Sequence, residues 1–359
     1  MRYRVLAINP GSTSTKISVF DDNVEVFIKT LRHDPAELDK VGPIMEQGEY
    51  RKGFVIEAMK ENNIDPKTLD AVVGRGGLVR PVHGGTFNIS EKMLVDLKDP
   101  SFWGRVHASN LGPHIANSIA KELNVPAFIV DPVAVDEIED IARISGVPEI
   151  TRKSLFHALN TRYTARKLAE KLGKKFEDCN IIGAHMGGGI SVVAFKKGRA
   201  VDVNNALLGM GPFSPQRAGA LPIGDLLTLA YSGKYTQKQL EGYLAKSAGL
   251  MAYLGTDDGK EITERIAAGD AEAKKYFDAM IYQIAKDIAG CGAVLSGKID
   301  AIFLTGGLAY GKYLVDELTS RIDFVAPVHI YPGEFEMQAL TEGAVKVLKG
   351  IEKAHDYKG

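Results

Sequence analysis

The amino-acid sequence predicts an α/β protein built from two related domains, and three observations lead to this prediction. The chain has 359 residues, more than one ordinary hydrophobic core holds and about right for two domains. Strand-like and helix-like patterns alternate along it, which favours mixed sheets covered by helices on both faces. A unit of three short strands near the N-terminus recurs in the middle of the chain, which indicates an internal duplication.

The first copy of this unit comprises strands at residues 4–8, 16–20 and 24–30, separated by a Gly/Ser turn and an Asp-Asp-Asn turn. The second copy has strands at 181–184, 191–195 and 199–203, separated by a triple-glycine turn and a Lys-Lys-Gly turn. The similarity continues beyond the first turn, where Ser18-Val19 resembles Ser191-Val192. The repeat therefore predicts one such three-stranded unit in each domain.

Helical patterns fill the intervals between the predicted strands. They lie at residues 91–98, 111–123, 154–172, 237–247 and 271–296. A further strand at 301–304 precedes Gly306-Gly307 and a helix at 312–320. The amphipathic tail at 337–353 is expected to pack back across the domain boundary. We therefore predict a first domain at 1–150, joined by about 335–359, and a second at 151–334.

Composition excludes several classes of function. The chain is 45% hydrophobic and 25% charged with a net charge of −1, so no overall field attracts nucleic acid or an acidic membrane. It contains no apolar run of transmembrane length and no signal-peptide pattern at its start. Cys179 and Cys291 form neither a disulfide framework nor a metal spacing, which suits a reducing cytoplasm. An anionic small-molecule ligand would have to be bound by local Arg and Lys side chains.

Three glycine-containing turns are candidates for binding phosphate. The first, Asn9 to Lys16, lacks the Gly-Lys-Ser/Thr ending of a Walker loop and precedes a strand instead of a helix. Its hydroxyls, amide and ammonium suit phosphoryl oxygens, although a tight turn with ordinary hydroxyl caps is the alternative. The second, at 185–191, contains three successive glycines that let a ligand approach the backbone. The third, at 304–308, ends a strand before a helix, where α/β sheets bind nucleotides.

Taken together, these turns and the segments between them resemble the acetate and butyrate kinase family of the hexokinase/actin/Hsp70 superfamily. The similarity spans the chain and keeps the family's order and spacing. Within the family, the sequences of the turns and the short length of the chain look like those of the butyrate-using branch and its branched-chain relatives. The matching segments are INPGSTSTK (8–16), VHGG (82–85), FIVDP (128–132), LFHALN (155–160), AHMGGGIS (184–191), SPQRAG (214–219), LTGGL (304–308) and YPGEFEM (331–337).

This resemblance implies two ribonuclease H-like domains of the actin/hexokinase type with a cleft between them. It also implies a Mg²⁺-dependent kinase that transfers the γ-phosphoryl group of ATP to a short-chain carboxylate, giving ADP and an acyl phosphate. A carboxylic acid with a pKa of about 4 to 5 is already ionised at pH 7, so no general base is needed. The site should therefore supply alignment and positive charge. The family also implies a homodimer or a higher homo-oligomer.

Roles for individual residues follow from the same resemblance. Asn9, Ser12, Ser14 and Lys16 are expected to line the phosphoryl site, and Asp131 and Glu334 to lie near Mg²⁺. His157 and His185 match histidines that contact the transferred phosphoryl group, and Arg217 matches an arginine that neutralises its charge. The structural alternatives are a helix cap or turn for the carboxylates and a satisfied core histidine for each imidazole.

One further arginine is expected near the VHGG segment, and two candidates remain. Counting back from His83-Gly84-Gly85 favours Arg80, whereas the end of the predicted strand favours Arg75. For the nucleotide, the expected contacts are Gly187, Gly188 and Gly189 near the β-phosphate, and Gly306, Gly307, Leu308 and Ala309 near adenine. For the acyl chain, the expected walls are Val82, Phe156 and the neighbourhood of Leu111.

Three other functions compete with a butyrate-using kinase. The first is a kinase of the same family that prefers acetate, propionate or a branched acid. The second is a non-enzymatic nucleotide switch like an actin or Hsp70 relative, which has no need for Arg217 and His157 at an acyl site. The third is a Rossmann-type dehydrogenase, against which the hairpin form of the first turn argues. The residues thus favour an enzyme with small-molecule substrates.

Overall fold

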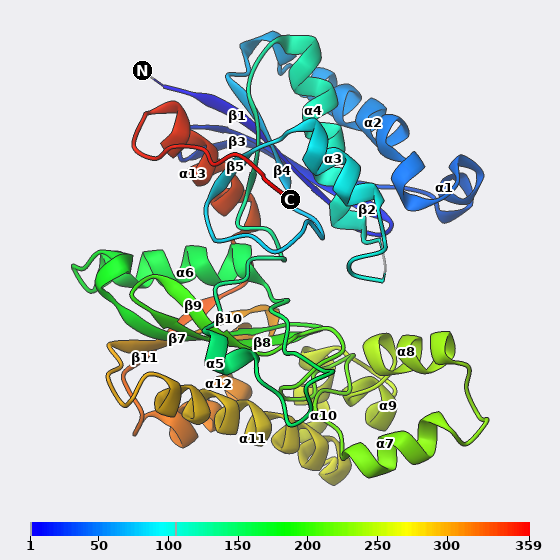
Figure 1. Ribbon diagram of the computed structural model, residues 1–359, viewed down its shortest axis with the longest axis vertical. Coiled ribbons are helices and arrows are strands. Elements are labelled where there is room, and N and C mark those ends of the chain that lie inside the picture. Colours follow the sequence, from blue (N-terminus) through cyan, green and yellow to red (C-terminus); the bar gives the residue numbers. More distant parts are fainter. Residues whose placement is uncertain (1, 105) are drawn as a thin grey trace. The chain divides into compact units, whose positions relative to one another are not determined.

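The computed structural model describes residues 2–104 and 106–359, and the chain divides into two compact units (Figure 1). The first unit extends to Val135 and includes Phe335–Gly359, and the second is Asp136–Glu334. Residues 136–150, which the sequence assigned to the first domain, thus lie in the second. The reason is local pairing, since Arg162 binds the Glu137 carboxylate at 2.8 Å and the Glu139 N–H donates to the Val201 carbonyl.

A six-stranded sheet forms the centre of the first unit. Its strand order is β3-β2-β1-β4-β6-β5. Strands β1 to β3 form an antiparallel meander, β4 and β6 run parallel to β1, and β5 is antiparallel to β6. The strands are β1 (Arg4–Pro10), β2 (Ser14–Asp21), β3 (Val24–Arg32), β4 (Ala71–Arg75), β5 (Thr86–Asn88) and β6 (Ala127–Val130).

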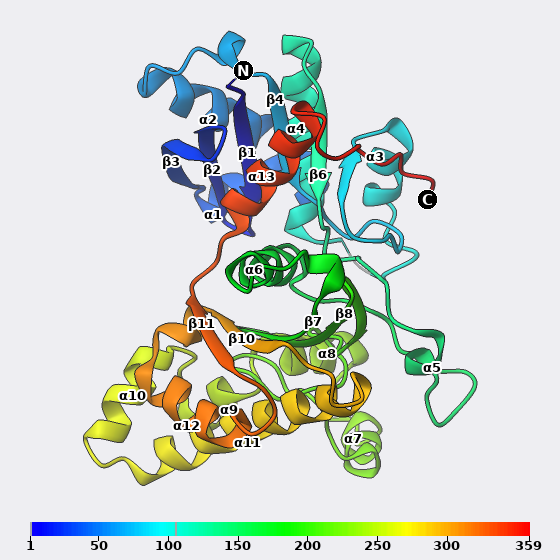
Figure 2. The same cartoon turned by 90° about the vertical axis from the view of Figure 1, so that its left-hand side faces the viewer.

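Helices cover both faces of this sheet. Helices α2 and α4 lie on one face and α13 on the other (Figures 1 and 2). The core between sheet, α2 and α4 contains Leu6, Val55 and Ile115, all at most 1% exposed. The α-helices are α1 (Pro35–Val41), α2 (Gly48–Glu61), α3 (Glu91–Lys98), α4 (Leu111–Leu123) and α13 (Glu336–Leu348); the 3₁₀ turns are Ile44–Glu46, Pro66–Thr68 and Ala108–Asn110.

Strand β4 and helix α4 cross at two glycines. A Cβ atom added to Gly74 would lie 2.4 Å from the Gly112 carbonyl oxygen, and one added to Gly112 would lie 2.4 Å from the Arg75 carbonyl oxygen. No side chain fits at either position without moving backbone. The crossing therefore sets the position of Arg75, the last residue of β4.

The second unit has a five-stranded sheet with the order β11-β10-β7-β8-β9. Helix α6 covers one face, and α11 and α12 lie on the other (Figure 2). The strands are β7 (Asn180–Met186), β8 (Ile190–Lys196), β9 (Arg199–Val203), β10 (Ala301–Gly306) and β11 (Val328–Pro332). The α-helices are α5 (Asp140–Arg143), α6 (Ala158–Lys171), α7 (Ile223–Ala230), α8 (Gln237–Lys246), α9 (Leu250–Leu254), α10 (Gly259–Ala267), α11 (Ala271–Val294) and α12 (Lys312–Ile322); the 3₁₀ turns are Phe176–Asp178 and Gly307–Tyr310.

The two sheets share a five-stranded arrangement, to which the first sheet adds β5 at its edge, and this confirms the predicted duplication. In each, an antiparallel meander of three strands is followed by two strands parallel to the first. Each meander also shifts register at a phenylalanine, Phe20 in one and Phe195 in the other. This register corrects one sequence match. In the first hairpin Lys16 pairs with Asn9, and at the equivalent place in the second hairpin Ser191 pairs with His185. Ser191 therefore occupies the position of Lys16 in the repeat and not that of Ser18.

Most predicted helices begin and end within a few residues of the observed ones, and the exceptions have local causes. The helix predicted from 154 begins at Ala158, because Leu155 is in a bridge with Asn205 and His157 is the N-cap. The amphipathic tail predicted at 337–353 is helical only to Leu348, and Gly350 follows with a φ of +70°. Such a left-handed residue commonly ends a helix.

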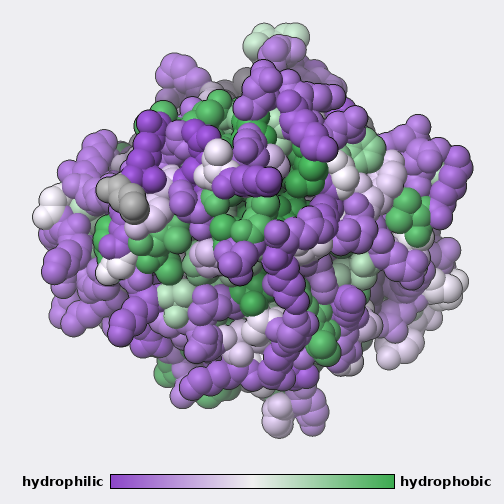
Figure 3. Space-filling model, turned by 90° about the horizontal axis from the view of Figure 1, so that it is seen from above, coloured by the Kyte–Doolittle hydropathy of each residue, from purple (hydrophilic) through white to green (hydrophobic). Residues whose placement is uncertain are grey.

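None of the helices in the described part of the chain is long and apolar enough to cross a membrane. Figure 3 shows one face of the molecule, on which hydrophilic residues predominate and hydrophobic residues appear in groups between them. The core residues Leu6, Val55 and Ile115 are buried inside the first unit.

Candidate active site

The first predicted phosphate turn connects β1 and β2 in the first unit. Asn9 and Lys16 face each other across the hairpin, and the Gly11 N–H donates to the Ser14 carbonyl at 2.7 Å to close the turn. Ser12 at the tip is exposed, whereas Ser14 and Lys16 are partly buried. The structure thus brings the four predicted phosphoryl-site residues, Asn9, Ser12, Ser14 and Lys16, onto one hairpin.

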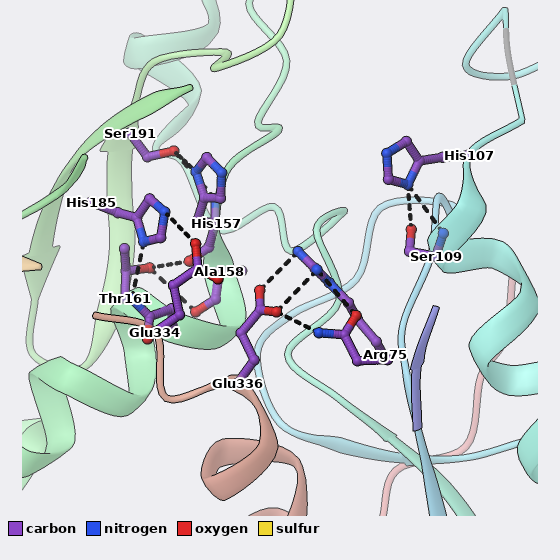
Figure 4. A network of polar contacts seen from close by, with 12 residues as sticks. Arg75, His107, Ser109, His157, Ala158, Thr161, His185, Ser191, Glu334 and Glu336 are labelled. Atoms are coloured by element: carbon purple, nitrogen blue, oxygen red, sulfur yellow. Dashed lines mark hydrogen bonds and ion pairs between the residues drawn. The ribbon is translucent and has the colours of Figure 1, made fainter. Parts of the chain in front are cut away.

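Arg75 and Glu336 extend this site from two other elements (Figure 4). The guanidinium of Arg75 binds the Glu336 carboxylate in a two-point contact at 2.9 and 3.1 Å, and it donates to Asn9 Oδ1 at 3.2 Å. Asn9 Nδ2 donates to the same carboxylate at 2.6 Å. Glu336 is only 7% exposed. The three side chains therefore form one closed network in which each orients the other two.

Arg80, the second arginine candidate, has different surroundings. Its guanidinium is 3.5 Å from Asp96 and lies over the Phe102 ring at 5.4 Å. Its side chain is 42% exposed, twice the 21% of Arg75. The positive charge of Arg75 is matched by a close carboxylate, whereas that of Arg80 is paired only loosely and at the surface.

Asp131 follows β6 and is held by the VHGG segment. The Gly85 N–H donates to Asp131 Oδ1 at 2.7 Å, and the Asp131 N–H donates to the Gly85 carbonyl at 2.9 Å. Asp131 has a φ of +36° and is 1% exposed. An aspartate in this left-handed region is uncommon and indicates a backbone set by its neighbours. Nearby, Val82 bridges Val135 and is partly buried.

In the second unit, His157 and His185 stack on each other. Their ring centroids are 4.0 Å apart with an angle of 14° between the planes (Figure 4). His185 lies in β7, and His157 is the N-cap of α6. His185 Nε2 is 3.7 Å from a carboxyl oxygen of Glu334, whose side chain is about half exposed. The fold thus brings together three predicted site residues.

Hydrogen bonds hold both rings in place. Asn160 Nδ2 donates to His185 Nδ1 at 3.0 Å. Ser191 Oγ accepts the His157 backbone N–H at 3.2 Å and forms a hydrogen bond with His157 Nδ1 at 2.8 Å. Each imidazole is therefore held through its Nδ1 atom.

Arg217 lies against the triple-glycine turn. A Cβ atom on Gly189 would be 2.2 Å from its guanidinium, so only glycine leaves room for this side chain. The guanidinium donates to the Ala206 carbonyl, and its buried Nε has no hydrogen-bond partner among the described residues. Burial lowers the pKa of Arg217, although an arginine stays charged at neutral pH. A buried cation with an unused N–H is suited to an anionic ligand.

The other glycines line a cavity in the second unit. Gly187, Gly188, Gly307 and Leu308 border a space of about 540 Å³. Gly306 is adjacent, with a φ of +91°, and a Cβ atom there would be 2.3 Å from the Met186 carbonyl oxygen. The remaining lining residues are Pro215, Asp257, Asp258, Gly259, Lys260, Thr263, Glu264, Phe277, Tyr310, Gly311 and Leu314. The volume and the mixed lining suit a nucleotide base with its ribose.

The residues predicted to line the acyl-chain pocket lie in different environments. Val82 is partly buried and Phe156 is 3% exposed. Leu111 lies fully inside the core of the first unit with Leu6 and Ile8, so it supports the fold and cannot touch a ligand. The residues 2–104 and 106–359 contain no group of three or more His, Cys, Asp or Glu side chains that could hold a metal. Asp131 belongs to the first unit and Glu334 to the second.

Several residues at these sites were not singled out from the sequence. Glu336 is two residues from the predicted Glu334 and could have been found as an acidic residue in the first turn of the last helix. Asn160 and Ser191 lie inside the quoted segments LFHALN and AHMGGGIS, yet only the structure shows that they orient the histidines. Asp257, which accepts from Gln216 at 2.6 Å, had no signal in the sequence.

A family model and two full-length relatives match this chain. Residues 147–324 match the family model described as the acetokinase family. "Butyrate kinase 1" of Clostridium acetobutylicum is 50% identical over 356 residues, which is 99% of this chain and all of that protein. "Butyrate kinase 2" of the same organism is 51% identical over 358 residues, all of both chains.

Solved structures show the same fold at lower identity. An acetate kinase from Porphyromonas gingivalis has a TM-score of 0.78 at 18% identity, covering 98% of this chain and all of that one. A propionate kinase from Francisella tularensis has a TM-score of 0.73 at 17% identity, covering 95% and 98%. From its full-length relatives and its fold, the chain belongs to the acetokinase family.

Proposed function

We propose that this chain is a butyrate kinase, which transfers a phosphoryl group reversibly between ATP and butanoate. The observation that carries the proposal is that about half of the residues are identical to those of two butyrate kinases over their full length. The geometry supports it, because two stacked imidazole rings and a buried arginine lie close to the triple-glycine turn that borders the cavity. None of these groups is needed by a protein that only binds nucleotide.

The chemistry requires no proton transfer. A carboxylate oxygen of butanoate attacks the γ-phosphorus of ATP, and the bond between that phosphorus and the β–γ bridging oxygen breaks. The products are butanoyl phosphate and ADP, and the electron pair of the broken bond leaves with ADP. We therefore assign the residues to alignment and charge neutralisation.

In this assignment, the Nε2–H groups of His157 and His185 donate to the oxygens of the transferred phosphoryl group. Arg217 neutralises the charge that develops on it, and the Asn9–Lys16 hairpin supplies hydroxyl, amide and ammonium donors. We assign the acceptor carboxylate to Arg80 and not to Arg75, since Glu336 already matches the charge of Arg75. Arg75 then holds Asn9 in place.

The nucleotide base is assigned to the cavity bordered by Gly307 and Leu308, with its phosphates toward Gly187 and Gly188. Mg²⁺ would be held by Asp131 and Glu334 together with phosphate oxygens. This sparse donor set fits Mg²⁺, which keeps waters and is bound by one or two carboxylates plus substrate phosphate. When bound, the ion neutralises charge on the β- and γ-phosphates.

The test is acyl phosphate formation from a panel of acids. Purified protein with ATP and Mg²⁺ should convert butanoate to a product that hydroxylamine traps as a hydroxamate. Propanoate and branched acids should react more slowly, and acetate more slowly still. Two methylenes are worth about 1.6 kcal/mol of transfer free energy, which gives a preference of roughly fifteenfold.

Reactions without acid and without ATP are the controls. Absence of hydroxamate with every acid from two to five carbons would contradict a carboxylate kinase. A higher kcat/KM for acetate, propanoate or isobutanoate would keep the kinase and replace the substrate.

We further propose that the protein works as a homodimer or a higher homo-oligomer. Helix α7 is built mainly from apolar residues, yet Ile223 and Leu227 are 76% and 52% exposed, and Tyr231 beyond its end is 87% exposed. A second copy of the chain covering this helix would remove a large apolar surface from water. Light scattering should give at least twice the mass of one chain, and a single-chain mass would contradict this.

We also place the enzyme in the cytoplasm. Cys179 and Cys291 are free thiols in the structure, as a reducing compartment would keep them. Activity should appear in the cytoplasmic fraction after cell fractionation, and recovery mainly from another fraction would contradict the assignment.

A further inference from the structure

The underside of the Asn9–Lys16 hairpin contacts a buried arginine from helix α2, which is distant in the sequence. Arg51 of α2 is 0% exposed. Its guanidinium donates to the carbonyl oxygens of Gly11 at 2.7 Å, Ser12 at 2.6 Å and Ser14 at 3.0 Å. It also donates to Thr15 Oγ1 at 3.3 Å. One side chain thus contacts four residues of the turn.

The fourth carbonyl of the turn is bound as well. The His33 N–H donates to the Thr13 carbonyl at 2.9 Å. Four consecutive carbonyl oxygens, from Gly11 to Ser14, therefore accept hydrogen bonds from groups of the first unit. A carbonyl oxygen repels a phosphoryl oxygen, whereas a backbone N–H attracts it. Binding all four carbonyls leaves the hydroxyl and N–H groups as the part of the turn suited to an anion.

The charge of Arg51 is not compensated by a carboxylate. No Asp or Glu of the described residues forms an ion pair with it, and its Nε and one Nη instead donate to Gln47 Oε1 at 3.2 and 2.8 Å. A buried arginine normally has a carboxylate partner, because an isolated buried charge is costly. Arg162 shows the ordinary arrangement, since it is 6% exposed and binds Glu137.

His33 does not supply a second charge. Burial, together with the nearby Arg51, lowers the pKa of His33 to about 4, so the ring is neutral at pH 7. Its Nε2 is hydrogen-bonded at 2.9 Å to Thr15 Oγ1, which also accepts from Arg51. Arg51 is therefore the cation among the groups that bind the underside of the turn.

We propose that Arg51 is a positioning residue for phosphoryl transfer, which turns the hairpin carbonyls away from the phosphoryl group and adds an uncompensated positive charge beneath it. This inference rests on the proposed function of the hairpin. The cost of burying the charge is then repaid when the anion binds, because the anion supplies the missing negative partner. This explains why the position beside Arg51 contains Gln47 and not a glutamate.

Two variants separate the two parts of the role. Arg51→Lys keeps the charge but has three N–H donors, too few for the contacts that Arg51 makes with three carbonyls, Thr15 and Gln47. Gln47→Glu keeps the guanidinium contacts but compensates the charge. At saturating ATP and butanoate, we expect kcat per folded molecule to fall at least tenfold in Arg51→Lys and at least threefold in Gln47→Glu. The KM for ATP should stay within about twofold, because the residues of the nucleotide cavity belong to the second unit.

The matched control is Arg162→Lys, which changes a buried arginine that binds Glu137 and the Gly198 carbonyl, residues outside the three glycine turns. It should lower thermal stability and leave kcat per folded molecule within twofold. If Arg51→Lys behaves like this control, Arg51 has only a structural role. If Arg51→Lys does not fold, Gln47→Glu decides, and an unchanged kcat in that variant overturns the role of the charge. The wild-type assay is run first, so that failure of the kinase activity itself is recognised separately.

Discussion

Replacing Arg217 with alanine should lower kcat by about 10²- to 10³-fold, the range for removing a single group that stabilises transition-state charge. The guanidinium is mostly buried, and its Nε has no hydrogen-bond partner among the described residues. We propose that this cation neutralises charge on the transferred phosphoryl group. The KM for ATP should change by less than about threefold, because Arg217 is absent from the cavity lining. Steady-state kinetics with varied ATP and butanoate measure both constants.

Gly189 offers an independent check of the same geometry. A methyl group there would overlap the Arg217 guanidinium, so Gly189→Ala should displace the side chain and reproduce most of the loss in kcat. Arg217→Lys keeps the charge but lacks the planar guanidinium group, so its kcat should lie between those of wild type and Arg217→Ala. An unchanged kcat in Arg217→Ala would exclude this residue from the mechanism.

Replacing Glu336 with alanine should have the largest effect on stability, on the order of 3 kcal/mol in the free energy of unfolding of the first unit. The change leaves Arg75 without its carboxylate and removes the acceptor of the Asn9 side chain. The pair is well shielded, with side-chain exposures of 21% and 9%, so solvent screens it little. Urea denaturation followed by circular dichroism measures the loss. Since Asn9 also loses one of its two side-chain hydrogen bonds, kcat should fall as well.

Arg80→Ala is the matched comparison. An exposed ion pair such as Arg80 with Asp96 contributes at most about 1 kcal/mol, so this variant should stay nearly as stable as wild type. If Arg80 binds the acceptor carboxylate, the KM for butanoate should rise and kcat should fall. A stable Arg80→Ala enzyme with wild-type kinetics, together with an inactive and well-folded Arg75→Ala enzyme, would reverse the assignment.

Local patterns explain why much of the fold could be predicted. Three turns are each specified by neighbouring residues, so they could be identified from the sequence. They are the hairpin around Gly11, the triple glycine at 187–189 and the turn at Gly306 that follows a strand. Helices α3 and α4 also begin and end at the predicted residues, because Ser90 caps α3 and Asn124, with a φ of +56°, follows α4. The fold and the phosphate turns were therefore predictable.

What the sequence could not supply were contacts between distant segments. Arg75 and Glu336 are 261 residues apart, and Arg51 is about 40 residues from the turn that it binds. The same limit produced the error at residues 136–150, since pairing of Glu137 with Arg162 is invisible in either segment alone.

By itself, then, the sequence determined a duplicated α/β fold with three glycine turns and pointed to the acetokinase family. Only the tertiary structure showed that Glu336 matches the charge of Arg75, that Asn160 and Ser191 orient two stacked imidazoles, and that Arg51 binds the underside of the first turn. The physical reason is that turns depend on local backbone conformation, whereas charge pairing and ring orientation depend on which side chains packing brings within hydrogen-bonding distance.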